Sequence, residues 1–195
     1  MLVVAGFLLG SIPWGLWAGR LRGVDLRTVG SGNIGATNAA RFLGAKWGIA
    51  IFILDTAKGA VAAFLTADPI GQLACGFASI LGHVFSPWVR FKGGRGVATS
   101  LGVFLAILPG PTLLAFGVWL LVVAISKRVS VGSVSAAIAY PFLVAAFDRS
   151  SPHRALHLGA AALVAVLIVV RHIPNLKRLL AGTEPATFGE KRAEP

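Results

Sequence analysis

The sequence is poor in the residues on which disulfide-linked proteins, metalloproteins and nucleic-acid-binding proteins depend. It has one cysteine, Cys75, so no disulfide can form within the chain. Its four histidines are scattered and show neither Cys-x-x-Cys nor His-Glu-x-x-His spacing, so we expect no metal site. Seven acidic residues face 18 lysines and arginines, which gives a formal net charge of +11. No basic stretch interleaves with an RNA- or DNA-binding pattern, so we expect no nucleic-acid partner.

Apolar residues, in contrast, are abundant. Hydrophobic residues make up 56% of the chain and charged residues 13%, and the mean hydropathy is +0.80. A soluble domain of 195 residues could not bury so much apolar surface. The composition therefore predicts an all-α, polytopic integral membrane protein. In such a protein the excess positive charge suggests basic loops that orient the chain in the bilayer and that contact anionic headgroups and anionic substrates.

Seven apolar runs are candidates for membrane helices. A spanning helix needs about 20 apolar residues, or roughly 17 if it is short. The fourth and fifth runs are short and only Pro109-Gly110-Pro111 separates them, so one long helical hairpin is as good an interpretation as two spans. No positive residue precedes the first run, so we interpret it as a retained helix and not a signal peptide. The runs are Leu2–Gly19, Trp47–Thr66, Ile70–Val89, Val97–Leu108, Thr112–Ile125, Val131–Phe147 and Ala155–Val170.

Alternating these seven spans across the bilayer separates the positive charges. Most lysines and arginines fall on one side, Arg149 and Arg154 fall on the other, and Lys58 lies inside the second span. By the positive-inside rule the crowded side is the cytoplasm, with the N-terminus outside and the C-terminus cytoplasmic. We expect a single membrane-embedded domain, 1–195, with a polar tail from about Leu179. The cytoplasmic charges are Arg20, Arg22, Arg27, Arg41, Lys46, Arg90, Lys92, Arg95, Lys127, Arg128, Arg171, Lys177, Arg178, Lys191 and Arg192.

The first cytoplasmic motif runs from Gly30 to Arg41. Its glycines allow the backbone to turn N–H groups inward, and its serine, asparagines and threonine add neutral donors around an arginine, an arrangement suited to an oxyanion. A flexible turn with helix-capping residues explains this segment alone equally well. The candidate phosphate-binding residues are Ser31, Gly32, Asn33, Gly35, Thr37, Asn38 and Arg41.

The second motif, Phe91 to Ser100, places two cations around a glycine pair before an apolar helix. Such a segment can offer backbone N–H groups and the positive end of a helix to a phosphate. It lacks Gly-Lys-Ser/Thr, so a nucleoside triphosphate site is not expected. A positive-inside anchor would explain the charges but not the glycines. The candidates are Lys92, Gly93, Gly94, Arg95 and Gly96.

The third motif is Arg171 to Arg178, followed by Gly182-Thr183-Glu184. His172 and Asn175 are three residues apart and would share a helix face, although Pro174 lies between them. A lone interfacial histidine is usually structural, but the two other motifs favour a ligand contact here. We therefore take His172 and Asn175 as the catalytic candidates.

Further polar residues lie outside the three motifs. Ser126, Ser130 and Ser133 flank Lys127-Arg128 and could extend a phosphate site, although helix capping and an ordinary anchor explain this region equally well. Asp55 and Lys58 lie three apart in the second span, where an isolated charge would cost several kcal/mol, so we expect them to pair. A structural pair and a substrate role are equally good interpretations of them.

The three motifs, in this order and on one side of the membrane, resemble those of the acyl phosphate:glycerol-3-phosphate acyltransferase family of bacterial membranes. The first helix carries Gly10-Ser-Ile-Pro13, and Asp55, Lys58 and Gly82-His83 also match the family pattern. Ile34 and Arg95 depart from it, because the family commonly has proline and lysine there. The resemblance spans essentially the whole chain.

The resemblance implies transfer of a fatty acyl group from acyl phosphate to the 1-hydroxyl of sn-glycerol 3-phosphate. The products would be 1-acylglycerol 3-phosphate (lysophosphatidic acid) and phosphate. It implies a multi-pass protein of the bacterial inner membrane, a cytoplasm-facing site, no cofactor and no obligate protein partner. His172 and Asn175 would orient the reacting groups, and either His172 or the departing phosphate would accept the proton. No serine or cysteine nucleophile stands beside a partner histidine, which favours direct transfer.

The alternative from another class is a transporter or channel for an anionic metabolite. Basic loops and helices rich in small residues also serve permeation. The sequence shows no repeat halves and no paired broken helices at mid-membrane depth, so this interpretation ranks second.

Overall fold

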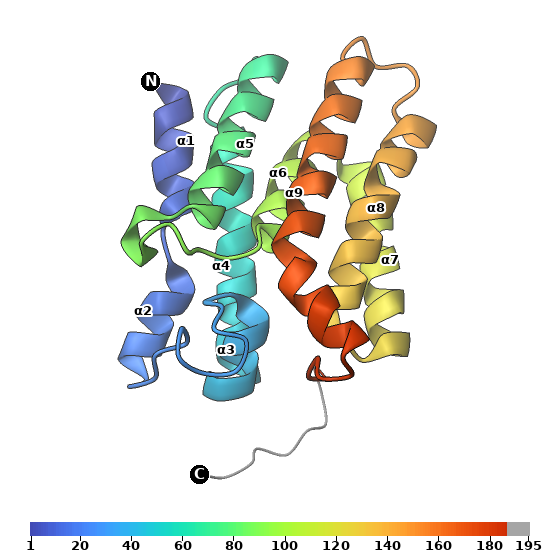
Figure 1. Cartoon of the computed structure of the whole chain (residues 1–195). Coiled ribbons are helices and arrows are strands. Elements are labelled where there is room, and N and C mark those ends of the chain that lie inside the picture. The colour runs from blue at the N-terminus through green and yellow to red at the C-terminus, as the bar shows by residue number, and fades with distance from the viewer. Residues whose placement is uncertain (187–195) are drawn as a thin grey trace. The chain divides into compact units, whose positions relative to one another are not determined.

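The computed structural model describes residues 1–186, and these residues form helices and connecting segments without a strand (Figure 1). The all-α prediction is confirmed. Helix packing divides the chain into two units, Met1–Pro109 and Gly110–Pro195. The predicted cytoplasmic charges Lys191 and Arg192 lie outside the described residues.

In the first unit, α1 packs along α5, and α4 packs along α6. Glycines allow both approaches: a side chain at Gly10 would collide with the backbone of Ser79, and one at Gly59 with the backbone of Thr99. The elements are α1 (Leu2–Ser11), α2 (Trp14–Leu21), α3 (Ala36–Leu43), α4 (Ala45–Ala63), α5 (Pro69–Val84), the 3₁₀ turn η1 (Pro87–Val89) and α6 (Val97–Ile107).

The first apolar run is not one continuous helix. It breaks at Ile12 and Pro13, where the expected span Leu2–Gly19 becomes α1 and α2. Pro13 has no N–H to donate, and its ring forces the preceding residue out of the helical region, so Ile12 has φ −57° and ψ 117°. The break leaves main-chain carbonyls within an apolar stretch, and these need partners from other elements.

The first motif contains a short helix. The sequence predicted a loop of hydrogen-bond donors here, but the second half of the motif is the helix α3. This helix follows Gly35 and ends before Gly44, whose φ of +100° is a conformation that glycine adopts without strain. Thr37, Asn38 and Arg41 are therefore helical.

The second unit contains α7 (Pro109–Ser126), α8 (Val129–Phe147) and α9 (Arg154–Leu180), with α8 packed on α9. The helix α9 is longer than the expected run Ala155–Val170. It continues through Pro174, so the third motif is helical up to Leu180. The predicted polar tail from about Leu179 stays a prediction.

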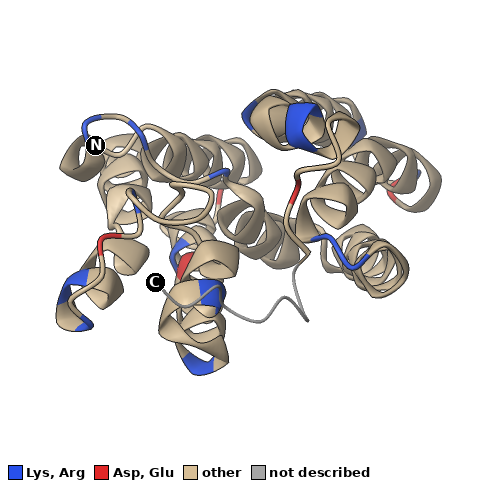
Figure 2. Cartoon of the chain, turned by 60° about the horizontal axis from the view of Figure 1, so that its bottom comes forward, with Lys and Arg blue, Asp and Glu red and all other residues tan. Residues whose placement is uncertain are grey.

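Four stretches of the described chain are long and apolar enough to cross a membrane: Leu2–Leu21, Pro109–Ser126, Val129–Phe147 and Arg154–Leu180. The helix α6 has 11 residues. That length corresponds to about 16 Å, against a hydrocarbon core of about 30 Å. The number of spans, the orientation of the termini and the single domain remain predictions. Lysines and arginines lie mostly at helix ends and in connecting segments (Figure 2).

Candidate active site

Asn38 fixes the first motif from within. Its Nδ2 donates to the carbonyls of Leu26 (3.0 Å) and Val29 (3.1 Å), and its Oδ1 accepts from the N–H of Ser31 (3.1 Å). The residue is 2% exposed. Asn38 was expected to bind phosphate, but its amide is occupied with the main chain. Its role in the structure is to hold the segment before Ser31 against α3.

The N–H groups of the first motif are also partly used within the chain. Gly32 donates to the carbonyl of Val29 (3.0 Å), and Gly35 donates to Oδ1 of Asn33 (2.8 Å). In this structure these N–H groups of Gly32 and Gly35 have acceptors within the chain, and their contact with a phosphate stays a prediction. The side chains of Ser31, Thr37 and Arg41 are half-buried. They remain the candidates for the phosphate contact.

The glycine pair of the second motif packs around His83, the second-last residue of α5. The N–H of Gly93 donates to the carbonyl of Val84 (3.0 Å), and that of Gly94 donates to the carbonyl of His83 (3.1 Å). A side chain at Gly93 would collide with this His83 carbonyl, and one at Gly94 with the His83 ring. Gly93 and Gly94 therefore allow close packing, and their N–H groups are not the open donors that the sequence suggested.

Gly96, Lys92 and Arg95 are the remaining candidates of the second motif. Gly96 has φ +86° and precedes the first turn of α6, a conformation that glycine adopts without strain. Lys92 is exposed and Arg95 half-buried. Before them Arg90 and Phe91 take the left-handed conformation, with φ 54° and 62°. Such conformations in residues with side chains are uncommon and are often found in functional segments.

In the second unit, His172 and Asn175 lie on one face of α9, as predicted, and both are buried at 1% and 3% exposure. Nδ1 of His172 lies 2.8 Å from the carbonyl of Ile168. A carbonyl can only accept, so Nδ1 carries a proton, and in a neutral ring the lone pair is on Nε2. Such a ring can accept a proton at Nε2.

Glu184 is the centre of the polar cluster in the second unit, and it was missing from the predicted site. Its Oε1 accepts from Nδ2 of Asn175 (2.6 Å) and Oγ of Ser130 (2.7 Å), and its Oε2 accepts from Nε of Arg178 (2.9 Å). Burial opposes ionisation, but the hydrogen bonds from Asn175, Ser130 and Arg178 outweigh it and keep the pKa of Glu184 below its usual value. The sequence signal that could have pointed to Glu184 is the Gly182-Thr183-Glu184 segment that follows the third motif.

Glu184 orients the amide of Asn175. Since Nδ2 donates to the carboxylate, Oδ1 must point elsewhere, and it has no hydrogen-bond partner among the described residues although it is buried. A buried amide oxygen without a partner can accept a hydroxyl or N–H of a ligand.

Ser133 has a partner within its own unit. Trp119 donates from Nε1 to its Oγ (3.2 Å), and the Trp119 ring stacks on Phe116. The hydroxyl proton of Ser133 is not engaged by this bond, so the expected phosphate contact stays a prediction.

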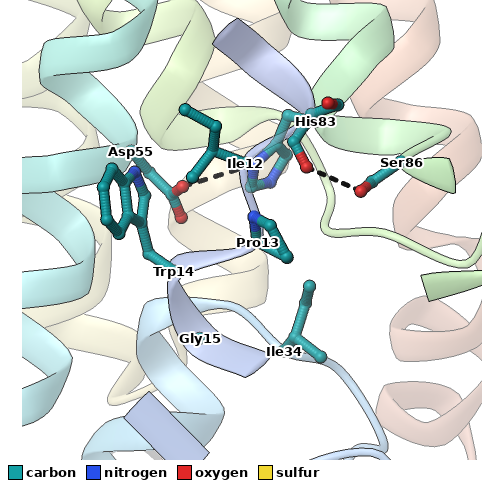
Figure 3. A pocket seen from close by; sticks show the side chains of 9 residues that line it. Ile12, Pro13, Trp14, Gly15, Ile34, Asp55, His83 and Ser86 are labelled. Atoms are coloured by element: carbon teal, nitrogen blue, oxygen red, sulfur yellow. Dashed lines mark hydrogen bonds and ion pairs between the residues drawn. The ribbon is translucent and has the colours of Figure 1, made fainter. Parts of the chain in front are cut away.

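Asp55 and Lys58 form the expected pair, with Lys58 Nζ 2.7 Å from Asp55 Oδ1. His83 joins them, since its Nδ1 lies 2.9 Å from Nζ. Together with residues around the break in the first helix, Asp55 and His83 line a small pocket in the first unit (Figure 3). No group of three or more His, Cys, Asp or Glu in the described chain could hold a metal ion.

The described helices thus define an integral membrane protein with two polar centres, one in each unit, built from cations, hydroxyls and an imidazole–carboxamide pair. The model of the family "Glycerol-3-phosphate acyltransferase" matches residues 1–182, and the chain belongs to that family. It is an integral membrane acyltransferase with glycerol 3-phosphate as a substrate, and phospholipid biosynthesis follows from the family.

Relatives and solved structures match over nearly the whole chain. The chain is 45% identical over 187 residues to the glycerol-3-phosphate acyltransferase of Trichlorobacter lovleyi, covering 93% of this chain and 94% of that protein. It is similar to the crystal structure of PlsY (YgiH), an integral membrane glycerol 3-phosphate acyltransferase, in its glycerol 3-phosphate form. The identity is 41%, the TM-score is 0.88, and 96% of this chain and 94% of that one are covered. The lysophosphatidic acid form of PlsY matches with a TM-score of 0.84, at 40% identity and the same coverage.

Proposed function

We propose that the acyl donor is acyl phosphate and that the acceptor is the 1-hydroxyl of sn-glycerol 3-phosphate. The products are 1-acylglycerol 3-phosphate and inorganic phosphate. The observation that carries this proposal is the cation supply of the motifs: Arg41, Lys92 and Arg95 suit two phosphate-bearing substrates, and no nucleotide-binding motif accompanies them. The lysophosphatidic acid form of PlsY is consistent with such a product.

The proposed reaction is a direct transfer. The 1-hydroxyl oxygen attacks the acyl carbonyl carbon, the bond from that carbon to the phosphate oxygen breaks, and phosphate leaves with the bonding electrons. His172, with its lone pair on Nε2, accepts the hydroxyl proton, or the departing phosphate does. Asn175, whose amide Glu184 orients, holds the hydroxyl or the acyl carbonyl.

The test of the donor is an assay of purified protein in detergent micelles, which have no compartments. We expect lysophosphatidic acid from acyl phosphate and glycerol 3-phosphate, and less than about a hundredth of that rate from acyl-CoA, since the sequence carries no nucleotide-binding motif. Equal turnover with acyl-CoA would refute the proposed donor. That result would not affect the assignment of the chain to the acyltransferases.

We also propose that the protein lies in the bacterial inner membrane with its three motifs facing the cytoplasm. The positive-inside distribution supports this orientation. In a Cys75→Ala background, Thr28→Cys and Thr183→Cys should resist an impermeant maleimide in intact cells, and Ser150→Cys, between the two outer arginines, should react. All three positions are exposed. The reverse labelling pattern would contradict the orientation.

A further inference from the structure

The break in the first helix and the buried charges opposite it take no part in the proposed reaction. Two carbonyls at the break, those of Ser11 and Ile12, receive hydrogen bonds from outside the helix. Oγ of Ser86 donates to the Ser11 carbonyl (2.6 Å), and Nζ of Lys58 donates to the Ile12 carbonyl (2.9 Å). Figure 3 shows Ser86, Asp55 and His83 around Ile12 and Pro13.

Nζ of Lys58 has three polar neighbours within hydrogen-bond distance. They are the Ile12 carbonyl (2.9 Å), Oδ1 of Asp55 (2.7 Å) and Nδ1 of His83 (2.9 Å). Nδ1 of His83 also lies 3.5 Å from Oδ1 of Asp55, so the three side chains form one cluster in which the role of Nδ1 depends on the ring tautomer. Lys58, Asp55 and His83 are 3%, 4% and 7% exposed, so water does not compete for these bonds.

Close after the break, α2 packs against the first motif. Gly15 follows Pro13 in the first turn of α2, and a side chain there would collide with the carbonyl of Ile34, the residue between Asn33 and Gly35. The position of the break therefore sets the position of the first motif.

The other end of the network connects to the second motif. The carbonyl of His83 accepts from Gly94, and a side chain at Gly94 would overlap the His83 ring. Lys58 thus contacts Ile12, three residues before the Gly15 contact with the first motif, and His83, which packs against the segment that carries Lys92 and Arg95.

Stability alone does not require this arrangement. Replacing a buried ion pair by apolar residues of similar size is often neutral or stabilising, and a lysine inside an apolar helix is costly unless its partners are complete. What an apolar pair could not do is bind a specific carbonyl at the break and a specific nitrogen of His83 together.

We propose that Lys58, held by Asp55 and His83, is a positioning residue that fixes the first motif relative to the second at the distance that glycerol 3-phosphate binding requires. The proposal rests on the proposed function only in placing the phosphate contacts at these motifs. It assigns Lys58 no contact with substrate.

The main variant is the double replacement Asp55→Leu with Lys58→Met, which removes both charges and keeps the volume. We expect a folded protein whose KM for glycerol 3-phosphate rises by about 10-fold or more, because misplaced phosphate contacts weaken binding before they affect chemistry. Thr56→Val is the matched control on α4, since among residues 1–186 the Thr56 hydroxyl donates only to the Phe52 carbonyl one turn away. It should leave KM unchanged.

A second measurement does not depend on activity. Spin labels at Thr28→Cys and Arg90→Cys in the Cys75→Ala background report the distance between the segments beside the two motifs, both sites being exposed. A single narrow distance distribution is expected in the parent protein and a broad or shifted one in the double variant.

If the double variant does not fold, Ser86→Ala replaces it, since it removes the other bond to the break without touching a charge. It should raise KM by about 3-fold or more and broaden the same distribution. A folded variant, double or Ser86→Ala, with parental KM and an unchanged distance distribution overturns the proposal. If the donor proves not to be acyl phosphate, the distance measurement still decides on Lys58.

Discussion

Glu184→Gln replaces one carboxylate oxygen of the Glu184 cluster by an NH₂ group. This change should lower both the stability and the activity of the protein. With the amide oxygen in the place of Oε1, the bonds from Asn175 and Ser130 survive, but the amide NH₂ then faces the N–H of Arg178. One charge-assisted hydrogen bond is lost, which is worth about 1.5–3 kcal/mol. The side chain of Arg178 is 32% exposed, so solvent screens the pair and the lower half of that range applies.

A loss of about 2 kcal/mol in a protein of this size lowers Tm by roughly 4–8 °C. The rate should fall by about 10-fold, because Asn175 keeps its hydrogen bond but loses a charged acceptor. The assays are thermal unfolding in detergent and the initial rate of acyl transfer. Thr183→Ala, in the same turn but exposed, is the matched control; it removes only a 3.3 Å hydrogen bond to the Arg178 carbonyl and should stay close to the parent in both. Parental Tm and rate in Glu184→Gln would refute the role of the cluster.

The pH dependence of stability follows from the same residue. The pKa of Glu184 is lower in the folded protein than in the unfolded chain, so its contribution is complete above the unfolded value, about 4.5, and is lost as pH falls toward the folded value. The parent should lose stability below about pH 4.5 more steeply than Glu184→Gln does. Parallel Tm profiles for the two proteins would show that the carboxylate is not stabilised by folding.

Three further predictions concern the motifs. His172→Ala and Asn175→Ala should each lower kcat by about 10²-fold, and Asn175→Ala should also lower Tm because it removes a hydrogen bond to Glu184; near-parental kinetics would remove them from the reacting centre. Arg41→Ala should raise the KM for glycerol 3-phosphate more than it lowers kcat, since a phosphate clamp binds substrate and transition state alike; a selective kcat loss would argue for a role in catalysis. Gly94→Ala should lower Tm because its side chain would overlap His83, and Gly159→Ala, with open space around it, should not.

The sequence predicted most helices closely, because their apolar runs are bounded by charges or by proline and glycine. The expected run Trp47–Thr66 became Ala45–Ala63, and Val131–Phe147 became Val129–Phe147. It did not predict the break in the first run. Pro13 lies in a strongly apolar stretch, and the carbonyls at the break are bound by Lys58 and Ser86, which are distant in sequence.

The candidate site was predicted by residue type but not by orientation. His172 and Asn175 share a face because helical periodicity is local and readable. Asn38 has the same functional group as Asn175, yet its amide is bound to the main chain of its own motif. Glu184 draws its partners from two helices, and such contacts are set by tertiary packing, which no spacing in the sequence encodes.

The most direct test of the account is a rapid-quench measurement of phosphate release from acyl phosphate by purified protein. Direct transfer predicts phosphate and 1-acylglycerol 3-phosphate in a one-to-one ratio, and only when glycerol 3-phosphate is present. His172→Ala should slow both products equally. A burst of phosphate approaching one equivalent per enzyme without glycerol 3-phosphate would show an acyl-enzyme intermediate and contradict the account.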